Sequence, residues 1–144
     1  MDRMSRVQLA LRVSDLAAAV DFYSRLFGES PAKHYDGYAN FAIADPPLKL
    51  VLFQGDGRES TRLDHLGVEV QSTEEVVATT QRLRGEGLST VTEDQTTCCF
   101  AVQDKVWVSA PGGEPWEVYT VLADVAPDDP AAACSDTVCC NLER

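Results

Sequence analysis

The sequence predicts an α+β fold in which two tandem β-α-β-β-β modules pair their sheets around a shared cleft. The first observation is that the order of predicted elements repeats after about 57 residues. The second is an ungapped match between residues 8–13 and 65–70, and the third is the equal length of residues 44–51 and 110–117. Because two long repeats do not make a solenoid, we expect the modules to pack side by side with their helices on the outer faces.

The first predicted module spans about residues 5–54 and opens with a strand at residues 7–13. Ser14 is predicted to cap a helix whose apolar residues recur at helical spacing, and Gly28 is predicted to end it. The polar, glycine-rich residues 54–58 are interpreted as a linker. The remaining strands of this module are predicted at residues 32–35, 38–43 and 48–53.

The second predicted module spans about residues 63–122 and repeats the same order. Ser72 and Glu75 have the spacing of a capping box, which predicts a helix that ends near Arg84. A turn is expected at Gln103-Asp104. The strands of this module are predicted at residues 65–70, 89–92, 98–102, 105–109 and 116–121.

Charge and hydropathy exclude several classes of partner. The 144 residues carry a formal net charge of -11, a field that repels phosphate backbones and anionic lipid headgroups. No apolar run approaches the roughly 20 residues that cross a bilayer, and the first residues lack a signal-peptide core. We therefore expect a cytoplasmic protein that binds neither nucleic acid nor membrane.

Three polar residues occupy related places in the repeat. Gln8 and His65 are equivalent positions on the first strand of each module, and Glu117 lies on the last strand of the second. A polar side chain on the apolar face of a strand needs a partner, and one divalent metal would serve all three. Each residue alone would be read as surface or satisfied core, but the repeat favours the metal. His34 has no repeat counterpart and is interpreted as surface.

The counterpart of Glu117 in the first module is Val51, which cannot bind a metal. One imidazole, one amide oxygen and one carboxylate leave coordination positions open. Such a set suits an iron(II) centre that binds dioxygen or substrate, whereas a structural zinc site is closed by four protein ligands.

The chain has five cysteines, an odd number that argues against a disulfide framework in a reducing compartment. Cys98 and Cys99 are adjacent, and in a fully extended strand their side chains would point to opposite faces. In a loop or at a strand end both sulfurs could turn toward one soft, thiophilic centre. The alternative is a pair of small buried hydrophobic residues.

Residues 123–144 form an acidic tail that is rich in small residues and lacks periodicity, so we expect it to be flexible. Cys134, Cys139 and Cys140 lie near its end. These thiols either pass a thiophilic substrate to the site and hold its product, or have no role.

Several motifs occur in a specific order: VSDL at residues 13–16, DFY at 21–23, YANFAI at 38–43, DHLGVEV at 64–70 and TCCFAVQDKVWV at 97–108. Together they resemble the glyoxalase/bleomycin-resistance/dioxygenase, or vicinal-oxygen-chelate, superfamily over about residues 5–122. Within it the chain is most similar to the carbon–arsenic lyases and the related cadmium-induced proteins.

The resemblance implies a vicinal-oxygen-chelate cleft whose metal ligands, with a catalytic role, are Gln8, His65 and Glu117. It also implies that Cys98 and Cys99 bind the arsenic of a trivalent methyl or aromatic organoarsenical. Iron(II) and dioxygen would then serve to release arsenite and an oxidised organic fragment. Many relatives exchange or pair modules through a dimer, and the two complete modules of this chain would permit a monomeric site, so we expect a monomer or a homodimer.

Three other classes compete with this lyase hypothesis. An isomerase of the glyoxalase type should have a carboxylate near Val51, and a metal-free drug-binding module would not need Gln8, His65 and Glu117 together. A non-catalytic protein that binds cadmium or arsenic would use the thiols without iron, dioxygen or turnover.

Overall fold

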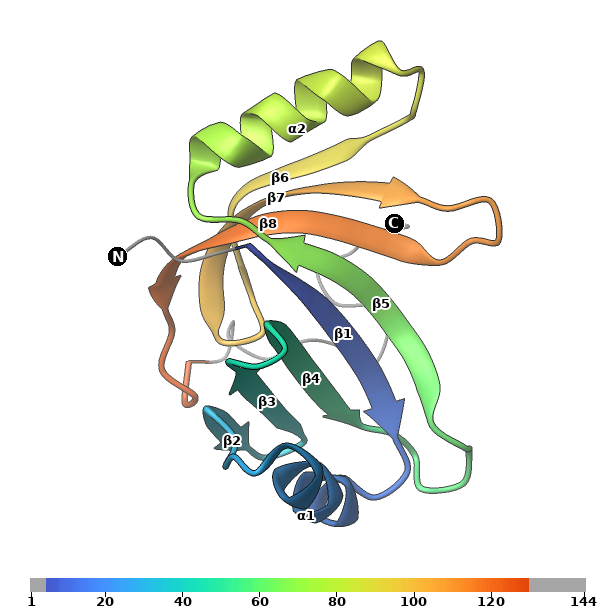
Figure 1. Cartoon of the computed structure of the whole chain (residues 1–144), viewed down its shortest axis with the longest axis vertical. Coiled ribbons are helices and arrows are strands. Elements are labelled where there is room, and N and C mark those ends of the chain that lie inside the picture. The colour runs from blue at the N-terminus through green and yellow to red at the C-terminus, as the bar shows by residue number, and fades with distance from the viewer. Residues whose placement is uncertain (1–4, 130–144) are drawn as a thin grey trace. The chain divides into compact units, whose positions relative to one another are not determined.

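The computed structural model describes residues 5–129, and its elements repeat in the predicted β-α-β-β-β order (Figure 1). The first five are β1 (Arg6–Val13), α1 (Leu16–Phe27), β2 (Lys33–Tyr35), β3 (Tyr38–Ile43) and β4 (Leu48–Gln54). The second five are β5 (Arg62–Glu69), α2 (Thr73–Gly85), β6 (Val91–Cys98), β7 (Ala101–Ser109) and β8 (Pro115–Asp124). The predicted β-α-β-β-β order is therefore confirmed, but the second half has one strand fewer than the predicted ranges. There β6 and β7 lie where three strands were predicted, at residues 89–92, 98–102 and 105–109.

The chain divides into two compact units, and the boundary falls within β5. One unit comprises Arg6–Leu66, and the other comprises the described residues from Gly67 onward together with Ser5. Each unit is described separately below.

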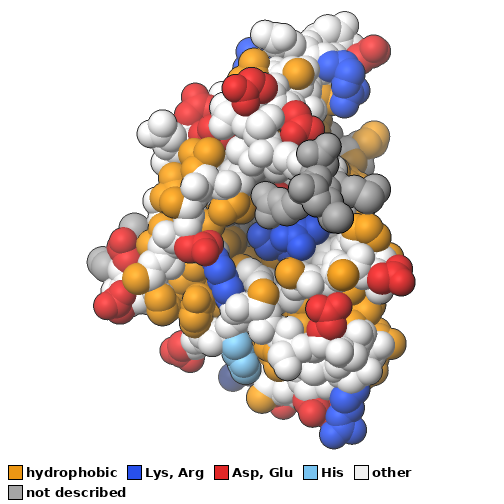
Figure 2. All heavy atoms as spheres, turned by 60° about the vertical axis from the view of Figure 1, so that its left-hand side comes forward, with side chains coloured by type: hydrophobic (Ala, Val, Ile, Leu, Met, Phe, Trp, Pro, Cys, Tyr) orange, Lys and Arg blue, Asp and Glu red, His pale blue; other side chains and the backbone are white. Residues whose placement is uncertain are grey.

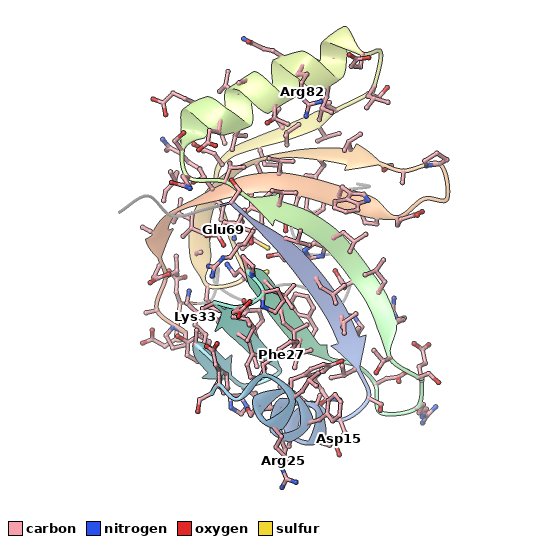
Figure 3. The ribbon with its side chains drawn as sticks, in the orientation of Figure 1. Asp15, Arg25, Phe27, Lys33, Glu69 and Arg82 are labelled. Atoms are coloured by element: carbon pink, nitrogen blue, oxygen red, sulfur yellow. The ribbon has the colours of Figure 1, made fainter. Side chains whose placement is uncertain are left out.

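In the unit Arg6–Leu66 the strands lie in the order β2-β3-β4-β1, with β4 parallel to β1 and antiparallel to β3. Helix α1 packs on this sheet against β3 and β4. Figure 3 shows Phe27 pointing from α1 toward the strands and Arg25 pointing away from them. One cluster of the buried core of this unit includes Val13, Leu16, Ala39, Phe41, Ile43, Leu50 and Leu52.

The start of α1 differs from the prediction. Asp15 rather than Ser14 is the N-cap, because its carboxylate accepts a hydrogen bond from the backbone N–H of Ala18 at 3.0 Å. Aspartate and serine are about equally good at this position, so the preference could not be read from residue type alone. Gly28 ends the helix with a left-handed φ of 71°, as predicted.

Gln54 was interpreted as part of a linker, but it belongs to β4 and fixes the start of α1. Its Oε1 accepts from the backbone N–H of Leu16 at 2.9 Å, and its Nε2 donates to the carbonyl of Ser14 at 2.8 Å. Gly55 extends this contact, because its N–H donates to the carbonyl of Val13 at 2.7 Å. The connecting loop therefore begins one residue later than the polar run suggests.

In the unit that begins at Gly67, β8, β7 and β6 form antiparallel neighbours in that order. Helix α2 packs against β7 and β8 over a small core that includes Val70, Val76 and Val106. The predicted N-cap is confirmed, because the Glu75 N–H donates to Ser72 Oγ at 3.2 Å. The Glu75 carboxylate reaches one residue beyond the N-cap, since its Oε2 accepts from the N–H of Gln71 at 3.0 Å.

The predicted turn at Gln103-Asp104 is wrong, and the predicted strand at residues 98–102 is not continuous. The turn lies at Cys99-Phe100, between β6 and β7, and Cys98 pairs with Ala101 across it. Gln103 and Asp104 lie inside β7 and are buried. Their side chains tolerate burial because they have hydrogen-bond partners within the protein. Polar residue type indicated a turn, whereas here it serves internal hydrogen bonds.

On the face shown in Figure 2, acidic side chains are spread over the surface and do not gather in one cluster. His34, on β2, is exposed, in line with its interpretation as a surface residue. Among the described residues no helix is both long and apolar enough to span a membrane.

Candidate functional site

Gln8 on β1 and His65 on β5 are brought together in the unit Arg6–Leu66. Both are buried, with 4% and 2% of their surface exposed. Gln8 Nε2 lies 3.2 Å from His65 Nε2. An amide nitrogen can only donate, so His65 Nε2 accepts and the ring proton sits on Nδ1. The lone pair on His65 Nε2 therefore faces Gln8.

Asp64 fixes the same orientation from the other side of the ring. Its Oδ1 accepts from His65 Nδ1 at 2.7 Å, which agrees with the proton position that Gln8 requires. Its Oδ2 accepts from Arg12 Nη2 at 3.0 Å, and the guanidinium of Arg12 lies 5.2 Å from the centre of the Phe53 ring. Arg12, Asp64 and His65 thus form a buried chain that ends at the imidazole.

Opposing effects act on the pKa of Asp64. Burial raises the pKa of this carboxyl, but the hydrogen bonds and charges of His65 and Arg12 together outweigh burial and lower it below its ordinary value of 3.8. Asp64 is therefore a carboxylate at neutral pH and can hold the Nδ1 proton of His65. This is the arrangement that orients metal-binding histidines in many proteins.

Glu117 lies on β8 in the other unit, so its approach to Gln8 and His65 stays a prediction. It is buried and ion-paired: its Oε1 lies 2.7 Å from the Nζ of Lys105 on β7. The strand register places Lys105 opposite Tyr119 and Trp107 opposite Glu117, which makes Lys105 and Glu117 diagonal neighbours. The ammonium also lies 5.4 Å and 5.8 Å from the ring centres of Trp107 and Tyr119.

Cys98 ends β6, and Cys99 is the first residue of the hairpin turn. Cys98 is buried and Cys99 is half-buried. Their Sγ atoms are 3.3 Å apart, well beyond the roughly 2.05 Å of a disulfide bond. The two thiols therefore lie side by side at a strand end, the placement that a shared soft ligand requires.

The predicted ligands fit a divalent metal by donor type. The imidazole of His65 presents an Nε2 lone pair, and Glu117 supplies a buried carboxylate. Rotation of the Gln8 amide would exchange its nitrogen for its oxygen, which can bind a metal. No group of three or more His, Cys, Asp or Glu side chains suited to a metal occurs within residues 5–129. The thiols of Cys134, Cys139 and Cys140 lie outside the described residues.

The supporting residues Arg12, Asp64, Gln103 and Lys105 were missed from sequence. Asp64 precedes His65, and that adjacency was the available signal for a carboxylate–histidine pair. Lys105 is a charged residue within a run of buried positions on β7, which indicates an internal partner. Its pairing with Glu117 depends on the hairpin register, which the misplaced turn concealed.

The sequence matches the profile of the Glyoxalase/Bleomycin resistance protein/Dioxygenase superfamily over residues 5–118. The chain belongs to this superfamily.

Among similar proteins is a trivalent organoarsenical cleaving enzyme from Thermomonospora curvata, 61% identical over 138 residues that cover 96% of this chain and 89% of that protein. The cadmium-induced protein CadI of Mycobacterium tuberculosis is 67% identical over 121 residues, 84% of this chain and 79% of CadI.

Solved structures share the fold at low sequence identity. An extradiol ring-cleaving dioxygenase from B. fuscum superposes with a TM-score of 0.62 at 21% identity, covering 84% of this chain and 34% of that one. The Mn(II)-bound glyoxalase from Novosphingobium aromaticivorans gives a TM-score of 0.61 at 21% identity, covering 89% of this chain and 44% of that one. The predicted vicinal-oxygen-chelate fold class is therefore confirmed.

Proposed function

We propose that this protein is an iron(II)-dependent dioxygenase that cleaves the carbon–arsenic bond of trivalent organoarsenicals. The observation that carries the proposal is the pair of thiols on Cys98 and Cys99, whose sulfurs lie 3.3 Å apart at a hairpin turn. The 61% identity to a trivalent organoarsenical cleaving enzyme supports the same substrate class. We place the activity in the cytoplasm, in a monomer or a homodimer.

The thiols of Cys98 and Cys99 capture the substrate. Two thiols replace the two hydroxyl groups of a trivalent methyl or aromatic arsenical, which leave as two waters, and the carbon substituent stays in place. The carbon–arsenic bond is then held in one position relative to the protein, which is catalysis by orientation. The buried position of Cys98 keeps water from one side of the complex.

Gln8, His65 and Glu117 would hold the iron(II), and Asp64, which accepts from Nδ1, would leave the Nε2 lone pair of His65 available as a ligand. When bound, iron supplies the means of activating dioxygen, which the side chains themselves lack. For a methyl arsenical, CH₃As(OH)₂ and O₂ balance to As(OH)₃ and CH₂O. The carbon supplies all the electrons that dioxygen takes up, arsenic remains trivalent, and no other reductant is needed.

A non-catalytic role in cadmium or arsenic binding is the second candidate. It is favoured by the 67% identity to the cadmium-induced protein CadI. In that role Cys98 and Cys99, with the thiols of Cys134, Cys139 and Cys140, would bind soft metals without turnover.

The test is to load the reduced protein with iron(II), add methylarsenous acid in air and follow the arsenic species. We expect multiple turnovers that release arsenite and require dioxygen. Cys98→Ser and Glu117→Ala are each expected to lower the rate by about a hundredfold or more. His34→Ala, which changes an exposed histidine, should match the unchanged protein. Methylarsenical that stays intact and bound in stoichiometric amount would instead establish the binding role.

A further inference from the structure

The turn that carries the thiols has an unfavourable backbone conformation. Cys99 and Phe100 have φ values of 55° and 65°, as both central residues of a type I′ turn require. Glycine and asparagine are the usual residues there, because a Cβ atom disfavours this region. Such a turn persists only when the surrounding structure holds it. It also turns Cys99 out of the strand alternation that would separate its thiol from that of Cys98.

Gln103 holds this turn from inside the second unit. It lies on β7 opposite Thr96, and only 5% of its surface is exposed. Its Nε2 donates a hydrogen bond to the backbone carbonyl of Cys98 at 2.9 Å. The bond joins the residue before the turn to a side chain that is itself enclosed by the protein.

The backbone around Gln103 is irregular on both sides. The register with β6 shifts between Glu93 and Thr96, and the register with β8 shifts between Val102 and Gln103. The first bulge is fixed by Asp104, which accepts from the N–H of Gln95 at 2.7 Å and from Thr73 Oγ1 at 2.6 Å. Bulges redirect side chains at functional sites, and here they bring the Gln103 amide to the end of β6.

We propose that Gln103 is a positioning residue that holds Cys98 and Cys99 in the geometry needed to bind one arsenic through both sulfurs. The inference rests on the proposed function. Because the turn is held before substrate arrives, little conformational freedom is lost on binding. Capture breaks two As–O bonds and forms two As–S bonds, while the two thiol protons leave with the hydroxides as water. No oxidant or reductant takes part.

The experiment uses the reduced full-length chain under argon, with Cys134, Cys139 and Cys140 replaced by serine. Phenylarsenous acid is the probe; its affinity is measured by calorimetry and its sulfur coordination by arsenic X-ray absorption. Gln103→Met removes the donor at nearly constant size, and Gln103→Glu replaces it with an acceptor should the first variant not fold. Gln54→Met is the control, because it removes amide–backbone hydrogen bonds of an exposed glutamine in the other unit.

The chain with the three tail cysteines replaced by serine is the background protein. We expect it and its Gln54→Met variant to bind one arsenic through two sulfurs with equal affinity. The Gln103 variant should bind about tenfold more weakly, with part of the arsenic held by one sulfur. Its alkylation by iodoacetamide, which needs only one thiol, should stay at the background rate.

Three results would overturn the inference. The first is an unchanged arsenical affinity in the Gln103 variant, and the second is an equal loss of affinity in Gln54→Met. The third is faster alkylation of the Gln103 variant, which would mean that an opened hairpin accounts for the lost affinity. If the background protein itself binds no arsenical, that result would contradict the proposed function, on which the inference rests.

Discussion

The imidazole of His65 is held by contacts on both ring nitrogens, and each contact has a distinct consequence. The Gln8 contact requires an acceptor at Nε2, and the Asp64 contact requires a donor at Nδ1. Both conditions are met by one tautomer of neutral histidine. Arg12 extends the chain, because its charge offsets the cost of burying the Asp64 carboxylate.

The lowered pKa of Asp64 predicts how stability depends on pH. A carboxyl whose pKa is lower in the folded than in the unfolded chain stabilises the fold above its unfolded pKa. That contribution is lost as pH falls through the folded value. We expect Asp64→Asn to lower the free energy of unfolding at pH 7, and this deficit should shrink below about pH 4. Urea unfolding with a chelator present measures the difference at each pH.

The control for this prediction is Asp21→Asn. Asp21 pairs with Arg25 at 3.2 Å on the surface of α1, and both side chains are more than half exposed. Exposed pairs contribute little, so this variant should remain close to the unchanged protein across the pH range. A deficit in Asp64→Asn that is constant from neutral to acid pH would contradict the proposed role of the charge.

At the scale of elements, a glycine lies at the end of each helix. We expect replacement by alanine to have opposite effects on stability at the two sites. Gly28 follows α1 with a φ of 71°, whereas Gly85 is the last residue of α2 and has no positive φ. A Cβ atom at either position would meet no atom within 4 Å. The effect of alanine is therefore conformational at both sites.

We expect Gly28→Ala to destabilise the protein by about 1 kcal/mol, because alanine disfavours the left-handed region. Gly85→Ala should stabilise it by up to about 1 kcal/mol, because alanine is the better helix former. Thermal unfolding of the two variants under one set of conditions compares them. Equal signs would show that side-chain contacts, rather than backbone preference, decide the result.

The end of α1, the start of α2 and the order of elements along the chain could be read from sequence because they depend on short-range signals. The capping box at Ser72 and the glycine at Gly28 each act within a few residues. The turn at Cys99-Phe100 could not be found in this way, since it lacks the residues that favour a type I′ turn. It depends instead on Gln103, which reaches back to the carbonyl of Cys98 from across the hairpin.

The candidate site shows the same limit. Gln8 and His65 were predicted as ligands because they occupy equivalent places in the repeat, and their roles and that of Glu117 stay a prediction. Lys105 and Arg12 carry no repeat signal, and their roles follow from partners that lie 12 and 52 residues away, Glu117 and Asp64. Such pairs are set by strand register, which a sequence pattern specifies only loosely.

At the scale of the whole molecule, the net charge of -11 acts differently on the metal and on the proposed substrate. A negative field concentrates divalent cations near the protein and speeds their association. A trivalent organoarsenical with two hydroxides is uncharged at neutral pH, so the same field neither attracts nor repels it. Added salt shortens the range of the field to a few ångströms at about 1 M and so separates the two effects.

We expect the rate of Mn(II) binding to the metal-free protein to fall by about tenfold when NaCl rises from about 20 mM to about 500 mM. Binding of phenylarsenous acid to the same protein should change little, because its capture depends on the covalent exchange at Cys98 and Cys99. Stopped-flow measurements of both ligands in one salt series provide the comparison. A parallel fall in the rate for the arsenical would mean that it reaches the thiols as a charged species. A rate of Mn(II) binding that does not depend on salt would mean that local ligands, rather than the overall charge, govern metal uptake.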